Sequence, residues 1–382
     1  MNKQFASLVL AAALTVSGLA HAGAREQARR MHDRIAGVPP SDAVLSQMEA
    51  DIAGGNPAAA AQRAMANSSF YNITLRNMAA PWTNRDQSRF VPLNDYTATV
   101  IGMVRDDVDF STLLSADLVY VANTSGAPAY SAANNDHYQY LDDNKVDLQQ
   151  ALQPQTQSGL LGIPVSATAG IMTTRAAAAA FFIAGTNRAM FRFTMLNHLC
   201  HDMDTVHDTT RPPDRIRQDV SRSPGGDSRV FLNNCIGCHS GMDPLAQAFA
   251  YYNYNETTGR LEYTAGSVQP KYLINKDNFK DGFVTTSDKW DNYWRKGQNQ
   301  LLGWDPALPG TGTGAKSMGQ ELGHSDAFAD CQVQKVFKAI CLRDPDSSAD
   351  RAKVQQIKNT FKSSGYKLKQ VVADSATYCM GN

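Results

Sequence analysis

After its first 22 residues the sequence has no hydrophobic run long enough to span a membrane. A spanning helix needs about 20 consecutive apolar residues. The apolar stretch 176–184 is much shorter, and Gly185, Asn187 and Arg188 follow it at once. We therefore expect a mature chain without a transmembrane anchor.

The sequence also lacks an excess of charge of either sign, since it has 36 basic and 36 acidic residues. Removing residues 1–22 takes away one basic residue, Lys3, and leaves a nearly neutral chain. Nucleic acids and anionic membrane surfaces attract chains with a marked positive charge. We therefore expect no nucleic acid and no anionic membrane surface among the partners.

Cysteine is scarce, with six residues, and the C-x-x-C spacing occurs only once. A structural zinc site needs further Cys or His residues at metal-ligand spacing, and there is no second C-x-x-C pair. A thioredoxin-like redox pair sits in a βαβ context, which the flanking sequence does not resemble. The single pair therefore calls for another explanation.

Residues 1–22 have the three parts of a secretory signal peptide. Lys3 gives a charged start, 5–19 is a short apolar run, and Ala20-His21-Ala22 is a small-residue cleavage site. No cysteine follows that site, so a lipoprotein anchor is not expected. The sequence predicts a periplasmic or otherwise exported protein.

The single C-x-x-C pair is followed directly by histidine, in the run Cys235-Ile236-Gly237-Cys238-His239. This is the pattern that attaches haem c. The thiols of Cys235 and Cys238 each add to one haem vinyl group, and His239 supplies the proximal iron ligand. Cys200-His201 repeats only the end of the motif, with Asn197 in place of the first thiol. We therefore predict one covalently attached haem.

The other cysteines, Cys200, Cys331, Cys341 and Cys379, form an even set that predicts two disulfides in an oxidising compartment. If Cys331 and Cys341 share one helix, they lie about 15 Å apart. A disulfide needs Cα atoms within roughly 7 Å. An up-down-up arrangement of the last three helices favours Cys341–Cys379, which leaves Cys200 for Cys331.

The periodicity and capping signals predict a mainly α, multi-helical fold with a cytochrome c-like haem domain and a C-terminal three-helix unit. The domains expected after the signal peptide are an N-terminal helical domain (23–155), a haem-attachment domain (156–265), and a loop with the three-helix unit (266–382). Helices are expected at 94–105 and 290–296, and another from Pro244 to about 252 with Asp243 as its cap.

The sequence resembles the planctomycete-type cytochrome C domain family and its companion domains of unknown function. In that family C-x-x-C-H is followed by an apolar residue and Asp-Pro-Leu, which are Met242, Asp243, Pro244 and Leu245 in this chain. Further similarity lies in the runs 38–40, 67–70, 328–331 and 365–368. The family continues with glycine and an acidic residue where this chain has Ala246 and Gln247. The resemblance implies haem binding and electron transfer, and it implies no substrate.

The sixth iron ligand has several candidates. Met318 is the first, because it follows a Gly-rich loop and precedes a C-terminal helix, as the distal methionine of small cytochromes c does. His324 is the next candidate, followed by His201 and Met203. Met242 lies only three residues after His239, too close to reach the opposite face of the same haem.

Three functions are compatible with these features. The first is an exported mono-haem c-type cytochrome that passes single electrons to a redox partner protein of unknown identity. The second is a haem enzyme with an open distal site for peroxide or oxygen, in which acid–base groups come from the set His198, His201, His207 and His324. The third is a haem-containing scaffold that binds a partner or polysaccharide through the aromatic segments 251–254 and 290–294.

Overall fold

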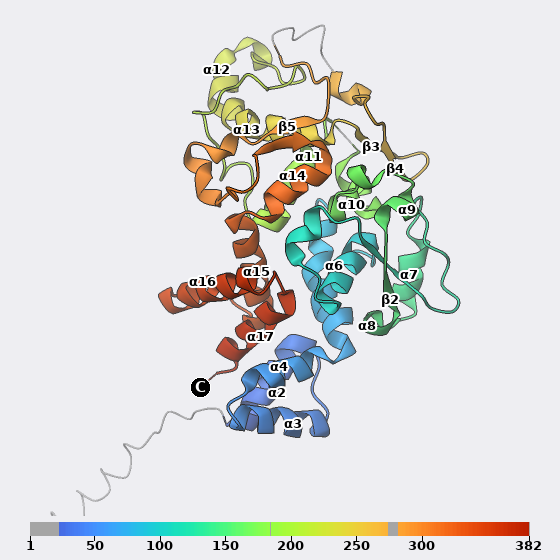
Figure 1. Cartoon of the computed structure of the whole chain (residues 1–382), viewed down its shortest axis with the longest axis vertical. Coiled ribbons are helices and arrows are strands. Elements are labelled where there is room, and N and C mark those ends of the chain that lie inside the picture. Colours follow the sequence, from blue (N-terminus) through green and yellow to red (C-terminus); the bar gives the residue numbers. More distant parts are fainter. Residues whose placement is uncertain (1–22, 184, 274–281, 382) are drawn as a thin grey trace, which may run out of the picture.

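The computed structural model describes residues 23–183, 185–273 and 282–381, so the predicted signal peptide lies outside the described residues. The described chain is mainly α-helical, as predicted, and its short strands form three separate antiparallel pairs (Figure 1). Within these ranges no helix is both long enough and apolar enough to cross a membrane.

The N-terminal part is a bundle of three helices, α2 (Ala24–Ala36), α3 (Asp42–Ala53) and α4 (Pro57–Met65). Two of them begin at caps that the sequence indicates. The Ser41 side chain accepts a hydrogen bond from the Val44 amide, and the Asn56 side chain accepts one from the Ala59 amide. These bonds satisfy amides that have no partner inside the helix.

The middle of the chain is built from short helices around a buried one, α6. These helices are α5 (Arg76–Ala79), α6 (Asp95–Arg105), α7 (Asp136–Asp143), α8 (Leu148–Ala151), α9 (Gln157–Leu161), α10 (Arg175–Phe181) and α11 (Arg188–Thr194). Strand β1 (Val119–Ala122) pairs with β2 (Leu152–Gln155) beside α6. The prediction of a helix at 94–105 is confirmed, with Asn94 as its cap.

The next part carries the C-x-x-C-H motif and two further strand pairs. Its elements are α12 (Ser228–Val230), α13 (Ile236–Ala246), β3 (Tyr252–Asn255) with β4 (Arg260–Tyr263), and β5 (Lys289–Asp291) with β6 (Thr311–Thr313). The helix predicted over 290–296 is wrong, because its first residues pair with β6 and only 293–295 form a 3₁₀ turn. The antiparallel pairing of β5 with β6, in which Asp291 lies opposite Thr311, outweighs the local helical pattern.

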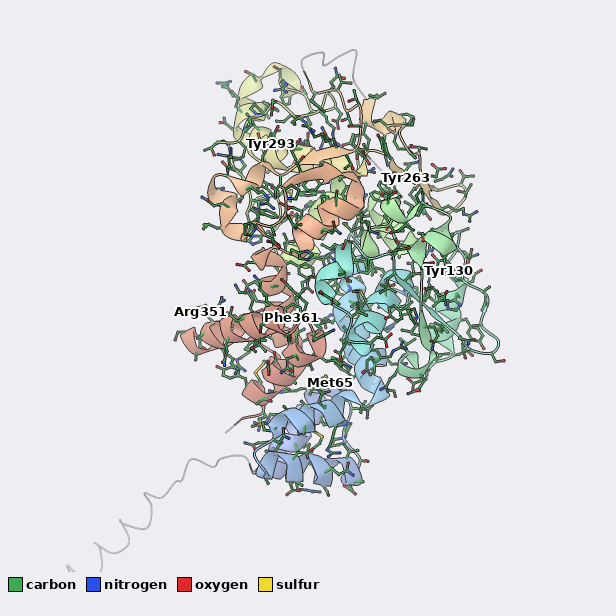
Figure 2. All side chains as sticks on the ribbon, viewed as in Figure 1. Met65, Tyr130, Tyr263, Tyr293, Arg351 and Phe361 are labelled. Atoms are coloured by element: carbon green, nitrogen blue, oxygen red, sulfur yellow. A yellow bond between two sulfur atoms is a disulfide. The ribbon has the colours of Figure 1, made fainter. Side chains whose placement is uncertain are left out.

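The chain ends in α14 (Gly314–Gly323), α15 (Asp326–Cys341), α16 (Ser348–Ser363) and α17 (Leu368–Cys379). The last three pack against one another, and Ser325 caps α15 as predicted. Helix α16 extends outward, with Arg351 toward its outer end and Phe361 toward its inner end (Figure 2). Phe361 is completely buried, so it anchors α16 on its two neighbours.

Both predicted disulfides are confirmed. Cys341 and Cys379 join the ends of α15 and α17, and Cys200 and Cys331 join the segment after α11 to α15. Helix α17 also packs on α2 and α4, which brings the two ends of the described chain together (Figure 1).

The buried apolar side chains form one large core that extends from α2 to α17. A small second cluster contains Ala250, Tyr251 and Tyr272. The large core crosses the predicted boundaries at 155 and 265, whereas the pairs β1–β2 and β3–β4 end close to them. The division into three domains stays a prediction.

Candidate functional site

The C-x-x-C-H motif lies on one helical run, at the end of the molecule opposite the N-terminal bundle (Figure 1). Helix α12 continues through a π-helical turn, Phe231–Cys235, directly into α13. Single π-helical turns inside α-helices are frequent at functional sites. Cys235 ends this turn, and Cys238 and His239 follow in the first turns of α13.

Both cysteines of the motif are half-buried and take no part in the two disulfides. The Cys238 thiol donates to the Met203 carbonyl over 3.3 Å. Burial raises the pKa of Cys238, and the nearby Asp204 carboxylate and Cys235 add to the rise. These effects favour the neutral thiol form of Cys238.

Gly237, between the two thiols, allows the His207 ring to pack closely on the motif. A Cβ atom at this position would lie 2.3 Å from the His207 ring nitrogen Nε2. The Gly237 carbonyl also accepts a hydrogen bond of 3.1 Å from the Asp208 amide. The segment with His207 thus packs directly on the backbone of the motif.

The orientation of the His239 ring is fixed from within its own helix. Its Nδ1 lies 3.1 Å from Oδ1 of Asp243, one turn further along α13, and Asp243 is completely buried. A carboxylate can only accept, so Nδ1 carries the proton, and in the neutral ring Nε2 then keeps its lone pair. Metal-binding histidines are commonly oriented by such a carboxylate.

This geometry corrects the expected role of Asp243. The sequence predicts that Asp243 caps a helix beginning at Pro244, but α13 begins at Ile236 and contains Pro244 in its interior. The Asp243 side chain accepts a hydrogen bond from His239 and does not cap a helix beginning at Pro244. His239 and Asp243 are four residues apart, and on a helix this i, i+4 spacing places two side chains side by side, so the sequence does contain a signal for the contact.

Asp243 is held by arginines that come from distant parts of the chain. Arg188, the first residue of α11, places Nε 2.7 Å from Oδ1 and Nη2 2.8 Å from Oδ2. The backbone amide of Arg217 donates to Oδ2 over 3.2 Å. Asp219 binds the other edge of the Arg188 guanidinium. Sequence reasoning missed Arg188, Arg217 and Asp219, because nothing local marks them as partners.

The charges in this cluster are stabilised by one another. Burial alone acts to raise the pKa of Asp243, but Arg188 and Arg217 hold it well below its ordinary value. Burial acts to lower the pKa of Arg188, yet the carboxylates of Asp243 and Asp219 raise it. Asp243 is therefore a carboxylate at neutral pH and presents a negative charge to the Nδ1–H of His239.

A pocket of about 690 Å³ opens beside the motif. Its volume lies in the range usual for small-molecule and cofactor sites, roughly 300 to 1,000 Å³. Its lining combines the motif with apolar and charged side chains, namely Arg85, Arg188, Ala189, Arg192, Phe193, Asp202, Met203, Asp204, Cys238, His239 and Met242. Haem c needs an imidazole nitrogen, two thiols and an apolar surround. The lining offers His239, Cys238 and apolar side chains, and the second thiol, Cys235, lies at the end of the π-helical turn that leads into α13. The residues present therefore fit this cofactor.

The candidates for the sixth ligand lie in different places. Met318 is completely buried in α14 and is not among the residues that line the pocket. His324 closes α14, with Nδ1 2.9 Å from the Gln320 carbonyl. Met203, the last candidate from the sequence, lies in the pocket wall with Cys238 and His239.

The four histidines proposed as distal acid–base groups are not brought together. His198 is completely buried, with Nε2 2.6 Å from the Tyr96 hydroxyl. His201 lies 3.3 Å from the Thr205 hydroxyl, and His207 packs on Gly237. Of the described residues that line the pocket, the only histidine is His239.

The aromatic segments proposed as a binding surface are partly interior. Tyr252, Trp290 and Trp294 are almost completely buried, and Tyr252 donates to the Ala167 carbonyl. Their rings thus contribute to the core, which removes most of the aromatic surface that a polysaccharide would stack on.

No family model, curated protein or solved structure matches this chain.

Proposed function

We propose that this protein is an exported mono-haem c-type cytochrome that transfers single electrons. Cys235 and Cys238 would hold the haem through thioether bonds, and Nε2 of His239 would bind its iron. The bound haem supplies an iron centre that accepts and releases one electron. The observation that carries the proposal is the His239–Asp243 contact of 3.1 Å, which fixes the ring through Nδ1 in a motif whose two cysteines take no part in the disulfides.

The protein's own contribution is to set the environment of that ligand. A charged Asp243 makes His239 a more basic ligand, because it accepts a hydrogen bond from Nδ1–H. Arg188 and Arg217 limit this effect by sharing the negative charge of the same carboxylate. The reduction potential is thus governed by the balance among these buried charges.

We propose Met203 as the sixth ligand in place of Met318. Met203 lines the pocket beside His239, whereas Met318 is buried in α14. A thioether ligand raises the reduction potential relative to a second histidine.

The two disulfides support the proposed export of the protein, because disulfides persist in oxidising compartments. The signal peptide and covalent haem attachment both require such export.

The test is expression of the full chain in a host that matures c-type cytochromes. The haem should stay with the wild-type protein through acidified-acetone extraction. It should be lost from a variant with Cys235→Ser and Cys238→Ser, while Cys200→Ser, at a cysteine outside the motif, should keep it. A wild-type protein without covalent haem would contradict the proposal.

The second candidate is a haem enzyme with an open sixth position, favoured by the Asp243 carboxylate. A more basic proximal ligand stabilises the higher oxidation states that peroxide chemistry uses. The optical spectrum separates the two. A low-spin, six-coordinate iron that does not react with peroxide supports electron transfer, and a high-spin, five-coordinate iron that reacts supports the enzyme.

A further inference from the structure

A second and larger cavity lies away from the haem motif. It is a cleft of about 1180 Å³ between α2, the segment from Ile73 to Arg89, and the C-terminal half of α15. None of the residues that line the pocket beside His239 lines this cleft. It therefore requires its own explanation.

The cleft concentrates positive charge in a chain whose total charge is zero. Seven of its lining residues are basic and three are acidic. Five of the basic ones have no ion pair with a carboxylate among the described residues: Arg29, Arg30, Arg34, Arg89 and Lys335. Of the acidic ones, Asp344 is paired with Lys338, whereas Glu26 and Asp33 have no ion pair among the described residues. The lining therefore keeps an excess of positive charge, with five unpaired cations against two unpaired carboxylates.

Lys335 is the most deeply placed of these groups. Its ammonium lies 4.7 Å from the centre of the Trp82 ring, and Trp82 itself is buried against His198. An aromatic face attracts a cation but does not cancel its charge. Burial lowers the pKa of Lys335 to about 8, so the site holds a desolvated and largely unpaired ammonium.

The arginines of α2 are also crowded by like charges. Arg30 and Arg34 each donate to backbone carbonyls at the end of α17, those of Met380 and Cys379. These bonds fix the side chains and supply only the partial negative charge of a helix C-terminus, not a full counter-charge. Burial, and then the charges of Arg30 and Arg343, lower the pKa of Arg34. A bound anion would relieve this repulsion.

We propose that this cleft binds a small anion that carries more than one phosphate or carboxylate group. Guanidinium groups bind both kinds of oxyanion through paired hydrogen bonds, and a lysine adds a point charge. Several cations spread around one cleft favour a multivalent anion over a monovalent one. This binding site is independent of the haem motif, because the two cavities share no lining residue.

Isothermal titration calorimetry of the purified full chain tests the proposal. Pyrophosphate and citrate are titrated separately, with acetate as the monovalent control. We expect saturable binding at one site per chain for at least one multivalent anion, and none for acetate. The anion with the higher affinity, pyrophosphate or citrate, shows whether the cleft prefers phosphate or carboxylate groups.

Lys335→Gln should weaken this binding about tenfold or more, since a charged hydrogen bond is lost. Arg89→Gln, at an exposed position, should weaken it as well and does not depend on how well the Lys335 variant folds. Arg351→Gln is the matched control, because it removes the same charge from an exposed position on the outer part of α16 (Figure 2).

Two results would overturn the proposal. One is the absence of saturable binding for both pyrophosphate and citrate. The other is an equal loss of affinity in the Arg351→Gln and Lys335→Gln proteins, which would mean a general effect of net charge. Neither measurement uses the haem, so failure here leaves the cytochrome proposal untouched.

Discussion

Replacing Asp243 by asparagine is the most informative change at the proposed haem site. The side chain keeps its size and loses its charge. In the native protein its carboxylate accepts two hydrogen bonds from the Arg188 side chain, one from the Arg217 amide and one from His239. After the change Asp219 is the one carboxylate that the described residues still offer to Arg188 and Arg217.

The expected loss of stability follows from the burial of these groups. Removing one partner of a buried ion pair costs about 3–5 kcal/mol, because the remaining charge is left without compensation. Asp219 still neutralises part of the Arg188 charge, and asparagine can still accept one hydrogen bond. We therefore expect a loss near the lower limit, about 3 kcal/mol.

Urea denaturation followed by circular dichroism measures this loss. Glu49→Gln is the control, since its ion pair with Arg25 is exposed and should contribute less than about 1 kcal/mol. In the haem-loaded protein Asp243→Asn should also raise the reduction potential, because His239 becomes a less basic ligand. A loss of stability no larger than that of the control, together with an unchanged potential, would refute the reasoning.

Three further predictions concern other positions. Met203→Ala should abolish the weak absorbance near 695 nm that a methionine–ferric haem bond gives, and Met318→Ala should leave it; the reverse result would restore Met318 as the ligand. Gly237→Ala should reduce the yield of haem-loaded protein several-fold, because its Cβ would collide with the His207 ring, and a normal yield measured by haem absorbance would contradict this close packing. Citrate affinity should fall as pH rises through about 8, where Lys335 loses its charge, and should stay level in Lys335→Gln; a wild-type affinity that does not change with pH would count against Lys335.

Local signals predicted much of this fold. Ser41 and Ser325 begin helices as expected, because capping depends only on neighbouring amides. Helix length and the reach of a disulfide excluded a Cys331–Cys341 bond, the up-down-up arrangement of the last three helices favoured Cys341–Cys379, and elimination gave Cys200–Cys331. The caps succeed because they rest on short-range geometry, and the disulfides because few pairings were possible.

The details of the candidate site were harder to predict. Asp243-Pro244 has the pattern of a helix start, but the helix arrives from α12 and continues through the proline. Arg188 meets Asp243 across 55 residues of sequence, and no periodic pattern marks such a contact. Met318, predicted from its place after a Gly-rich loop, is buried in α14 and lies outside the pocket lining, and its role as a ligand stays a prediction.

Mass spectrometry of a tryptic digest tests the central claim most directly. Trypsin should release residues 230–260 as one peptide, because no lysine or arginine lies between Arg229 and Arg260. The account predicts that this peptide carries the mass of one haem, bound through Cys235 and Cys238. Recovery of the same peptide without added mass, from protein matured in a competent host, would contradict the account.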